Sequence, residues 1–118
     1  MAKYLILIYG DEQKWAGLTA EQQQVIYQGH ASFQAKAGDA ILGSNQLQPG
    51  STATSLRPGS GAGPTITDGP FLETKEGLGG YYLLEAADLD EVISLAGQLP
   101  EVTADYSGVE IRPVVEQA

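Results

Sequence analysis

The stretch LGGYYLLEA (residues 78–86) decides the fold class of this chain. After its glycine pair, the side chains alternate between two faces, and both faces are apolar. One face carries Tyr81 and Leu83, and the other carries Tyr82 and Leu84. The segment KYLILIY (residues 3–9) has the same property. Because strands that are apolar on both faces are covered on both sides in folded proteins, the sequence predicts a sheet with a packed layer against each face.

Two helices are predicted by capping patterns and by periodic apolar residues. Thr19 precedes Gln22 by three residues, and Asp88 precedes Glu91 by three, which are the spacings of capping boxes. The residues expected on the inner face of the first helix are Ile26, His30, Phe33 and Ala37, and on that of the second Leu89, Val92, Ile93 and Ala96. Pro100 is expected to stop the second helix.

The remaining strands surround a hairpin. AILGSNQLQ (residues 40–48) predicts a second strand, and SGVEIRPVVEQ (residues 107–117) predicts a closing strand that Pro113 places near a sheet edge. Between them a hairpin spans residues 52–70, with the glycine-rich run PGSGAGP (residues 58–64) at its tip. This run lacks the Lys-Ser/Thr pair of a phosphate-binding P-loop, so we interpret it as a flexible connection.

The order of elements is βαβ, a hairpin insertion, and βαβ again. It predicts an α+β ferredoxin-like fold in one domain, residues 1–118, with an antiparallel sheet and both helices on one face. The other sheet face would then be apolar and uncovered, which a monomer of this size does not favour. We therefore expect a homodimer in which the open sheet faces of two copies pack together.

Composition restricts the function. The 118 residues carry a formal charge of −9, which repels nucleic-acid phosphates and anionic lipids, so neither is an expected partner. The chain has no cysteine and one histidine, which excludes thiol chemistry and makes a zinc site unexpected, and no metal or cofactor is predicted. The apolar run in residues 1–12 is too short for a signal peptide or a membrane span, so a cytoplasmic protein is expected.

His30 is the one side chain that titrates near neutral pH without help from its surroundings. On spacing alone it is a core or interface histidine whose ring nitrogens are satisfied by neighbours. The functional alternative is a general acid or base in a cleft between the first helix and the sheet. That role needs a carboxylate within hydrogen-bond distance, for which Asp68 and Glu73 are the candidates.

The stretch DGPFLETKEGLGGYY (residues 68–82) also has two interpretations. Asp68 suits a turn, and the charges at Glu73 and Lys75 suit either a solvated connection or the rim of a site. The glycine pair Gly79-Gly80 weakens a strand unless it forms a bulge or admits a close neighbour. That neighbour is either a ligand on a cleft floor or a dimer partner, and the sequence leaves both open.

The segment TDGPFLETKEGLGGYYLLE (residues 67–85) closely resembles the motif of the DGPF-domain proteins of the YCII-related family. The resemblance extends to KYLILIYGDEQKW, LQPGSTATSLR and VEIRPV, in the family's order. It implies a dimeric α+β barrel and a bacterial protein of unsettled reaction, in some relatives an accessory of alternative sigma factors. It also implies a catalytic pair of a helix-one histidine and an aspartate after the second helix. His30 matches the first position, but the second falls near Leu99-Pro100, where this chain has no aspartate.

Two functions follow as hypotheses. In the first, the protein is an enzyme acting on a small organic molecule, with His30 as acid or base and Asp68 as its orienting carboxylate. The side chains expected to bind the ligand are Glu73, Lys75, which would attract an anionic substrate, and the hydrogen-bond donors Tyr81 and Tyr82. In the second, the homodimer is a non-catalytic binding or regulatory module that presents its acidic surface or the 58–64 hairpin to a protein partner.

Overall fold

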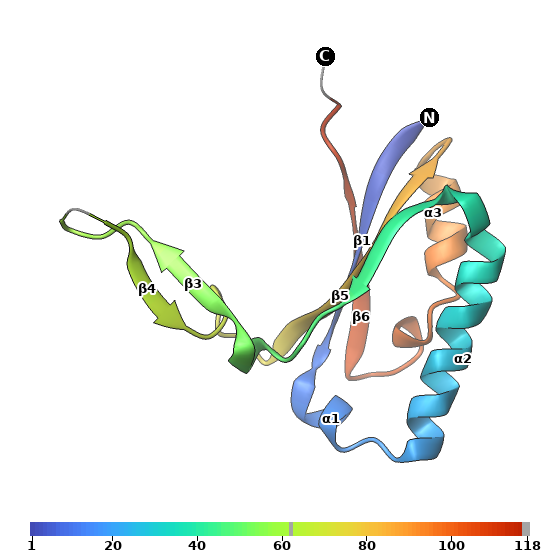
Figure 1. Cartoon of the computed structure of the whole chain (residues 1–118). Coiled ribbons are helices and arrows are strands. Elements are labelled where there is room, and N and C mark those ends of the chain that lie inside the picture. The colour runs from blue at the N-terminus through green and yellow to red at the C-terminus, as the bar shows by residue number, and fades with distance from the viewer. Residues whose placement is uncertain (62, 117–118) are drawn as a thin grey trace.

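The computed structural model describes residues 1–61 and 63–116 and shows a sheet, a helical layer and a projecting hairpin (Figure 1). The strands are β1 (Ala2–Asp11), β2 (Ile41–Gln46), β3 (Thr54–Arg57), β4 (Thr65–Asp68), β5 (Glu76–Ala86) and β6 (Ser107–Pro113). The helices are α1 (Glu12–Ala16), α2 (Ala20–Ala37) and α3 (Leu89–Ala96). Short 3₁₀ turns lie at η1 (Gly38–Ala40), η2 (Gly50–Thr52) and η3 (Pro100–Val102).

The main sheet has the strand order β2-β5-β1-β6, and every neighbouring pair is antiparallel. With β3 and β4 set aside as an insertion, this is the ferredoxin-like order, and α2 and α3 lie on one side of the sheet (Figure 1). The predicted fold is therefore confirmed. Pro113 is the last residue of β6, which lies at an edge of the sheet, as predicted. At an edge, the missing N–H of a proline need not remove a hydrogen bond between strands.

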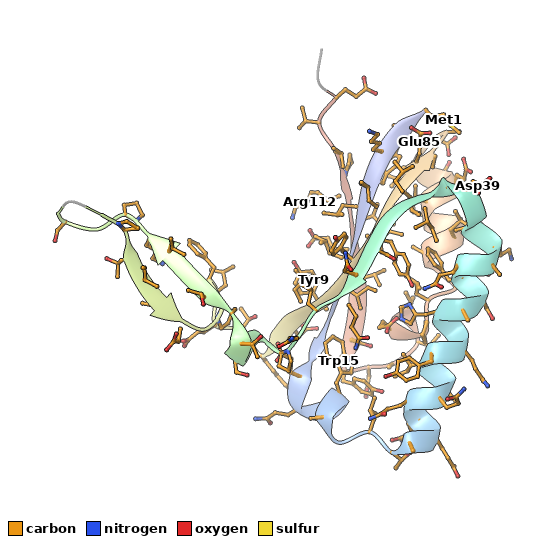
Figure 2. All side chains as sticks on the ribbon, viewed as in Figure 1. Met1, Tyr9, Trp15, Asp39, Glu85 and Arg112 are labelled. Atoms are coloured by element: carbon orange, nitrogen blue, oxygen red, sulfur yellow. The ribbon has the colours of Figure 1, made fainter. Side chains whose placement is uncertain are left out.

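The core lies between the sheet and the helices (Figure 2). Alternate side chains of β1 and β5 point into it and are buried together with the ring of Phe33 from α2. These strand residues are Tyr4, Ile6, Ile8, Tyr82, Leu84 and Ala86. The intervening residues of the same strands, such as Leu7 and Leu83, lie on the opposite face and are half-buried within one chain. The sheet therefore has one packed apolar face and one open apolar face.

Both predicted helix starts are confirmed by their hydrogen bonds. The Thr19 hydroxyl accepts from the Gln22 N–H, and the Gln22 side chain accepts from the Thr19 N–H, which completes a capping box. The Asp88 carboxylate accepts from the Glu91 N–H at the start of α3. These bonds satisfy amide groups that have no partner inside the helix.

The predicted inner face of α3 is partly wrong. Val92 and Ala96 are buried as expected, but Leu89 and Ile93 are exposed. Within each pair the two residues are four positions apart, so each pair lines its own side of this eight-residue helix. Leu99, fully buried just beyond the helix, supplies the apolar contact that the second pair does not.

Gly79 of β5 admits the chain's own Trp15. The β1–β5 register pairs Ile8 with Gly80 and Tyr9 with Leu78, which leaves Gly79 as a bulge. A Cβ atom at Gly79 would lie 2.6 Å from the indole ring of Trp15, and a Cβ at Gly10 would also collide with that ring. Trp15 belongs to α1, at the end of the sheet where β1 finishes (Figure 2). Within one chain, the close neighbour of Gly79 is therefore this tryptophan, and that of Gly80 is the β2 backbone, where a Cβ would lie 3.0 Å from the Asn45 carbonyl oxygen.

Strands β3 and β4 form a separate two-stranded sheet that projects from the body (Figure 1). The arm, defined as residues 50–75, extends to the side of the main sheet opposite the helices. It gives the chain a radius of gyration of 16.3 Å, whereas a compact domain of this length has about 13–14 Å. The hairpin predicted over residues 52–70 thus forms, but stands apart from the core.

Candidate functional site

His30 lies where α2 faces the sheet, between the helix and two partners from distant parts of the chain. Its Nδ1 atom is 2.7 Å from the Tyr82 hydroxyl, and its Nε2 atom is 2.8 Å from Oε2 of Glu101. The apolar spacing of α2 turns His30 inward one turn before Phe33, and β5 presents Tyr82 on the same packed face. The His30 side chain keeps 19% of its surface exposed, so this cluster reaches the protein surface.

A continuous set of hydrogen bonds links Gln34, Tyr82, His30 and Glu101. The Gln34 amide donates to the Tyr82 oxygen at 3.2 Å. If the Tyr82 hydroxyl then donates to Nδ1, a neutral His30 carries its proton on Nε2 and donates it to the Glu101 carboxylate. In this arrangement every donor meets an acceptor: the Gln34 amide donates to Tyr82, Tyr82 to His30, and His30 to Oε2 of Glu101. Gln34 is exposed and forms the solvent end of the set.

Tyr82 is held in its protonated form. Burial raises the pKa of its phenol, the negative charge of Glu101 adds to the rise, and the hydrogen bond from Gln34 opposes it. Its ring stacks near His30, with centroids 5.8 Å apart, and tilts against Phe33 at 4.7 Å. The phenol therefore keeps a proton that it can donate to Nδ1 of the imidazole.

Glu101 comes from the 3₁₀ turn η3, which is pressed against α2. A Cβ atom at Gly29 would lie 2.9 Å from the ring of Pro100, so the glycine allows this close approach. Glu101 is only 7% exposed, and the Ser107 hydroxyl donates to its backbone carbonyl. Among residues 1–61 and 63–116, its Oε1 atom has no hydrogen-bond partner. A buried carboxylate that has a free oxygen retains acceptor capacity for one further donor.

A small cavity of about 20 Å³ borders Glu101. Its walls are formed by Trp15, Ile26, Pro100, Glu101, Ala104, Tyr106 and Ser107. This volume suits a single water molecule, which needs about 10–15 Å³ by this kind of measure. A larger ligand would have to displace one of the walls.

The structure brings Glu101, rather than Asp68, to His30. Asp68 is exposed on β4, where it pairs with Thr54, and the arm that carries it lies on the other side of the sheet from α2 (Figure 1). Neither Asp68 nor Glu73 is hydrogen-bonded to His30 in the described part of the chain. The reason is topological, because the insertion that contains both carboxylates leaves the sheet away from the helical layer.

The predicted tyrosine pair is divided between the two sheet faces. Tyr82 faces α2 and joins the His30 cluster, whereas Tyr81 points to the open face and accepts a hydrogen bond from the Asn45 amide at 3.0 Å. This division follows directly from strand alternation, which places successive residues on opposite faces. Only one of the two phenols can therefore serve a site at His30.

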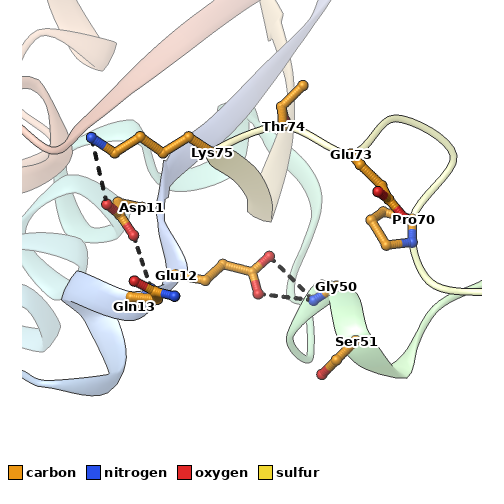
Figure 3. Close-up of a pocket in the computed structure, with 9 residues that line it drawn as sticks. All are labelled: Asp11, Glu12, Gln13, Gly50, Ser51, Pro70, Glu73, Thr74 and Lys75. Atoms are coloured by element: carbon orange, nitrogen blue, oxygen red, sulfur yellow. Dashed lines mark hydrogen bonds and ion pairs between the residues drawn. The ribbon is translucent and has the colours of Figure 1, made fainter.

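Lys75 and Glu73 line a different hollow, at the base of the arm (Figure 3). This open pocket has a volume of about 410 Å³. Both carboxylate oxygens of Glu12 accept from the Gly50 N–H, at 3.0 and 3.2 Å, and the Lys75 ammonium lies 4.0 Å from Asp11. Lys75 is 83% exposed, so its ion pair contributes little to stability. These residues mainly join the arm to the end of β1.

No group of three or more His, Cys, Asp or Glu side chains in ranges 1–61 and 63–116 is placed to hold a metal ion. No helix in those ranges is both long enough and apolar enough to cross a bilayer.

Sequence reasoning missed Glu101, although a signal for it was present. The family resemblance places a carboxylate after the second helix, near Leu99-Pro100, and Glu101 is the next residue along the chain. A glutamate has one more methylene than an aspartate, so a shift of one position still allows its carboxylate to reach His30. A search for any acidic residue within one position of Pro100 would have identified it.

Tyr82 should make stability depend on pH in the alkaline range. Because its pKa is raised above the usual 10.0, the folded state keeps the phenol proton at a pH where the unfolded chain has lost it. This stabilisation is complete below about pH 10 and is lost as the pH rises toward the folded-state pKa, by up to about 1.4 kcal/mol per pH unit. Urea unfolding of wild type and Tyr82→Phe at pH 8–11 measures the difference.

The wild-type free energy of unfolding should fall more steeply above pH 10 than that of Tyr82→Phe. Tyr27→Phe is the matched control, because Tyr27 is an exposed tyrosine on the same helix as His30. Its curve should stay parallel to that of wild type. Parallel curves for Tyr82→Phe and wild type would show that the phenol is not titrating differently in the two states.

Comparison with known proteins places the chain in a family. Residues 2–118 match the YCII-related domain. The chain is also 36% identical over 114 residues to "Uncharacterized protein R00369" of Rhizobium meliloti (strain 1021). The aligned residues cover 94% of this chain and 90% of that protein. With a family match over nearly its full length and a relative aligned over almost the whole of both sequences, this chain belongs to the YCII-related domain family.

Proposed function

We propose that this protein carries out acid/base chemistry on a small organic molecule at His30. The observation that supports the proposal is the placement of one imidazole between a buried carboxylate and a buried phenol, at 2.8 and 2.7 Å. A base oriented by a third group is the usual arrangement of activated proton-transfer sites. In this proposal Glu101 takes the orienting role that the sequence assigned to Asp68.

Each residue has a separate task in this proposal. Glu101 accepts the Nε2 proton, holds the ring in one tautomer and stabilises the imidazolium when His30 gains a second proton. Nδ1 accepts the Tyr82 proton while the Tyr82 oxygen takes a proton from the substrate, so that the phenol, whose raised pKa disfavours the phenolate, is protonated before and after the step. A substrate oxygen or nitrogen would replace the exposed Gln34 amide at the Tyr82 oxygen. The reacting group would thus enter from the α2 surface.

Binding and turnover screens test this assignment. The probe is a library of small carboxylic acids, lactones and phenols, screened by ligand-observed NMR against wild type and His30→Ala. Hits that are turned over should lose activity by about 10²-fold or more in His30→Ala. Glu101→Gln should reduce the rate while leaving binding nearly intact. Lys75→Ala is the control, because Lys75 lies in the pocket at the arm base.

Equal turnover of every hit by wild type and His30→Ala would remove His30 from the mechanism. A loss in Lys75→Ala instead would move the active site to the base of the arm. The two outcomes are distinguishable because no hydrogen bond links Lys75 to the His30 cluster in the described residues.

A second candidate function is a non-catalytic binding or regulatory module. The observation that favours it is the size of the cavity beside Glu101, about 20 Å³, which holds no organic substrate without a rearrangement of its walls. In that case the hydrogen bonds of His30 serve to lock α2 and η3 onto the sheet. Binding to a protein partner, with no turnover of any library compound, is the result that this candidate predicts.

We further propose that the protein acts as a homodimer joined through the open sheet face. Leu5 on β1 and Leu83 on β5 are cross-strand partners on that face, on the side that the helices leave uncovered. Sedimentation at micromolar concentration should give twice the 12.4 kDa chain mass. Leu83→Asp should give a monomer, because a carboxylate buried in an apolar interface is strongly disfavoured.

Val25→Asp is the control for this experiment. It adds the same charge at an exposed apolar residue, but on α2, within the helical layer on the other side of the sheet. Its mass should stay that of the dimer. A wild type that sediments as a stable monomer would refute the homodimer.

A further inference from the structure

The two faces of the arm differ in what covers them. On one face the chain folds back on itself: the Ser55 hydroxyl donates to the Gly69 carbonyl at 2.7 Å, and Ser55 is buried. On the same face the Arg57 guanidinium lies 3.8 Å from the centre of the Phe71 ring and donates to the Phe71 carbonyl. Gly69 and Phe71 therefore cover part of this face, around Ser55, while Arg57 and Thr65 remain exposed.

The opposite face of the arm is bare: it carries the exposed apolar pair Leu56 and Ile66 and, next to it, the exposed pair Thr54 and Asp68. Leu56 and Ile66 are direct cross-strand partners, so their side chains stand side by side. Their exposed fractions are 56% and 65%. A two-stranded hairpin on its own is only marginally stable in water and normally needs a further layer against its apolar face. The position of this pair on an otherwise isolated hairpin indicates that another surface covers it.

The direction of the arm shows where that surface lies. The arm leaves the body where β2 ends and β5 begins, and extends away from the helices, on the side of the open sheet face (Figure 1). Its base is fixed to the body by the Glu12 carboxylate, which accepts from the Gly50 N–H (Figure 3). A body packed on the open face therefore lies beside the arm.

Charge also favours a second copy of this chain as the occupant. Residues 50–75 contain two positive and two negative side chains, namely Arg57, Lys75, Asp68 and Glu73, so their net formal charge is zero. All of the −9 charge of the chain is therefore outside the arm. The arm is the segment that can approach another strongly acidic copy without net repulsion.

We propose that the arm clasps the second subunit of a homodimer, burying Leu56 and Ile66 against it. This inference rests on the proposed packing of the open sheet faces and adds a second, separate contact. In a two-fold dimer each arm would reach across to the other body, so every arm contact occurs twice. The arm would then contribute to affinity and fix the relative orientation of the subunits.

Thiol labelling tests the proposal directly, because the natural chain has no cysteine. Ile66→Cys places the only thiol on the bare face of the arm. Thr65→Cys is the control: Thr65 is also exposed, but it pairs with Arg57, so its side chain lies on the other face. Each is labelled with Ellman's reagent in the wild-type background and in the Leu83→Asp background. Ile66→Cys should react at least about 10-fold more slowly when the protein is dimeric, whereas Thr65→Cys should change by less than about twofold.

The affinity of the dimer provides a second readout that does not depend on labelling. The double variant Leu56→Ser/Ile66→Ser should raise the dissociation constant by about 100-fold, because symmetry removes each contact twice. Circular dichroism confirms that each variant remains folded.

The outcomes separate the arm from the dimer itself. If the protein is dimeric but Ile66→Cys reacts as fast as in the Leu83→Asp background, the clasp is refuted and the sheet-face dimer stands. If wild type is monomeric, both proposals are refuted. Slow labelling together with the weakened double variant supports the clasp.

Discussion

Glu101→Ala should lower the free energy of unfolding by about 3 kcal/mol. The substitution removes the acceptor of the His30 Nε2 proton and leaves that polar atom partly buried without its partner. It also enlarges the small cavity between η3 and α2. Urea unfolding followed by fluorescence measures the change, since Trp15 is the single tryptophan and forms one wall of that cavity.

Two further variants show whether the loss comes from the buried hydrogen bond. Glu101→Gln keeps the shape and an acceptor oxygen, so it should cost only about 1 kcal/mol. Glu110→Ala removes a carboxylate from an exposed pair with Arg112 and should cost less than about 0.5 kcal/mol. If Glu101→Ala were as mild as Glu110→Ala, the His30–Glu101 contact would have no importance for the folded state.

Gly79→Ala should lower the free energy of unfolding by about 2–3 kcal/mol. The added Cβ would lie 2.6–2.7 Å from the Trp15 ring, well inside van der Waals contact. The indole ring is also packed tightly against β1, because a Cβ atom at Gly10 would collide with it. The ring therefore cannot relieve the clash at Gly79 by moving toward β1. The bulge at Gly79 therefore exists to hold this side chain against the sheet.

A double-mutant cycle isolates the cause of that loss. In a Trp15→Ala background, Gly79→Ala should cost less than about 0.5 kcal/mol, giving a coupling energy of about 2 kcal/mol. Gly108→Ala is the control, because Gly108 also lies in a strand but a Cβ there would meet nothing within 4 Å. Unfolding is followed by circular dichroism, since Trp15→Ala removes the fluorophore. An equal cost of Gly79→Ala with and without Trp15 would show that the loss comes from the strand backbone.

Local patterns in the sequence were sufficient for the architecture. The alternation at Tyr81–Leu84 correctly predicts which side chains face the core, and the capping residues Thr19 and Asp88 correctly place the starts of α2 and α3. The hairpin insertion and the strand order also follow from element order. These features depend on residues only a few positions apart, so their physical causes are present in short segments.

Several smaller features were beyond those patterns. Helix α1 has only five residues, too few for an apolar period, and is defined by the Asp11 carboxylate, which accepts from two N–H groups at its start. The exposure of Leu89 and Ile93 depends on how α3 rotates against the sheet. The identity of the neighbour at Gly79 depends on where α1 places Trp15.

The sequence by itself determined the two-faced strands, the helix ends and the presence of a histidine on the inner side of α2. Only the tertiary structure decided that His30 meets Glu101, 71 residues further along the chain, and not Asp68. Such a pairing depends on the close packing of Pro100 against Gly29 and on the direction in which the arm leaves the sheet. Contacts of this range arise from the docking of whole elements, which propensity and periodicity do not encode.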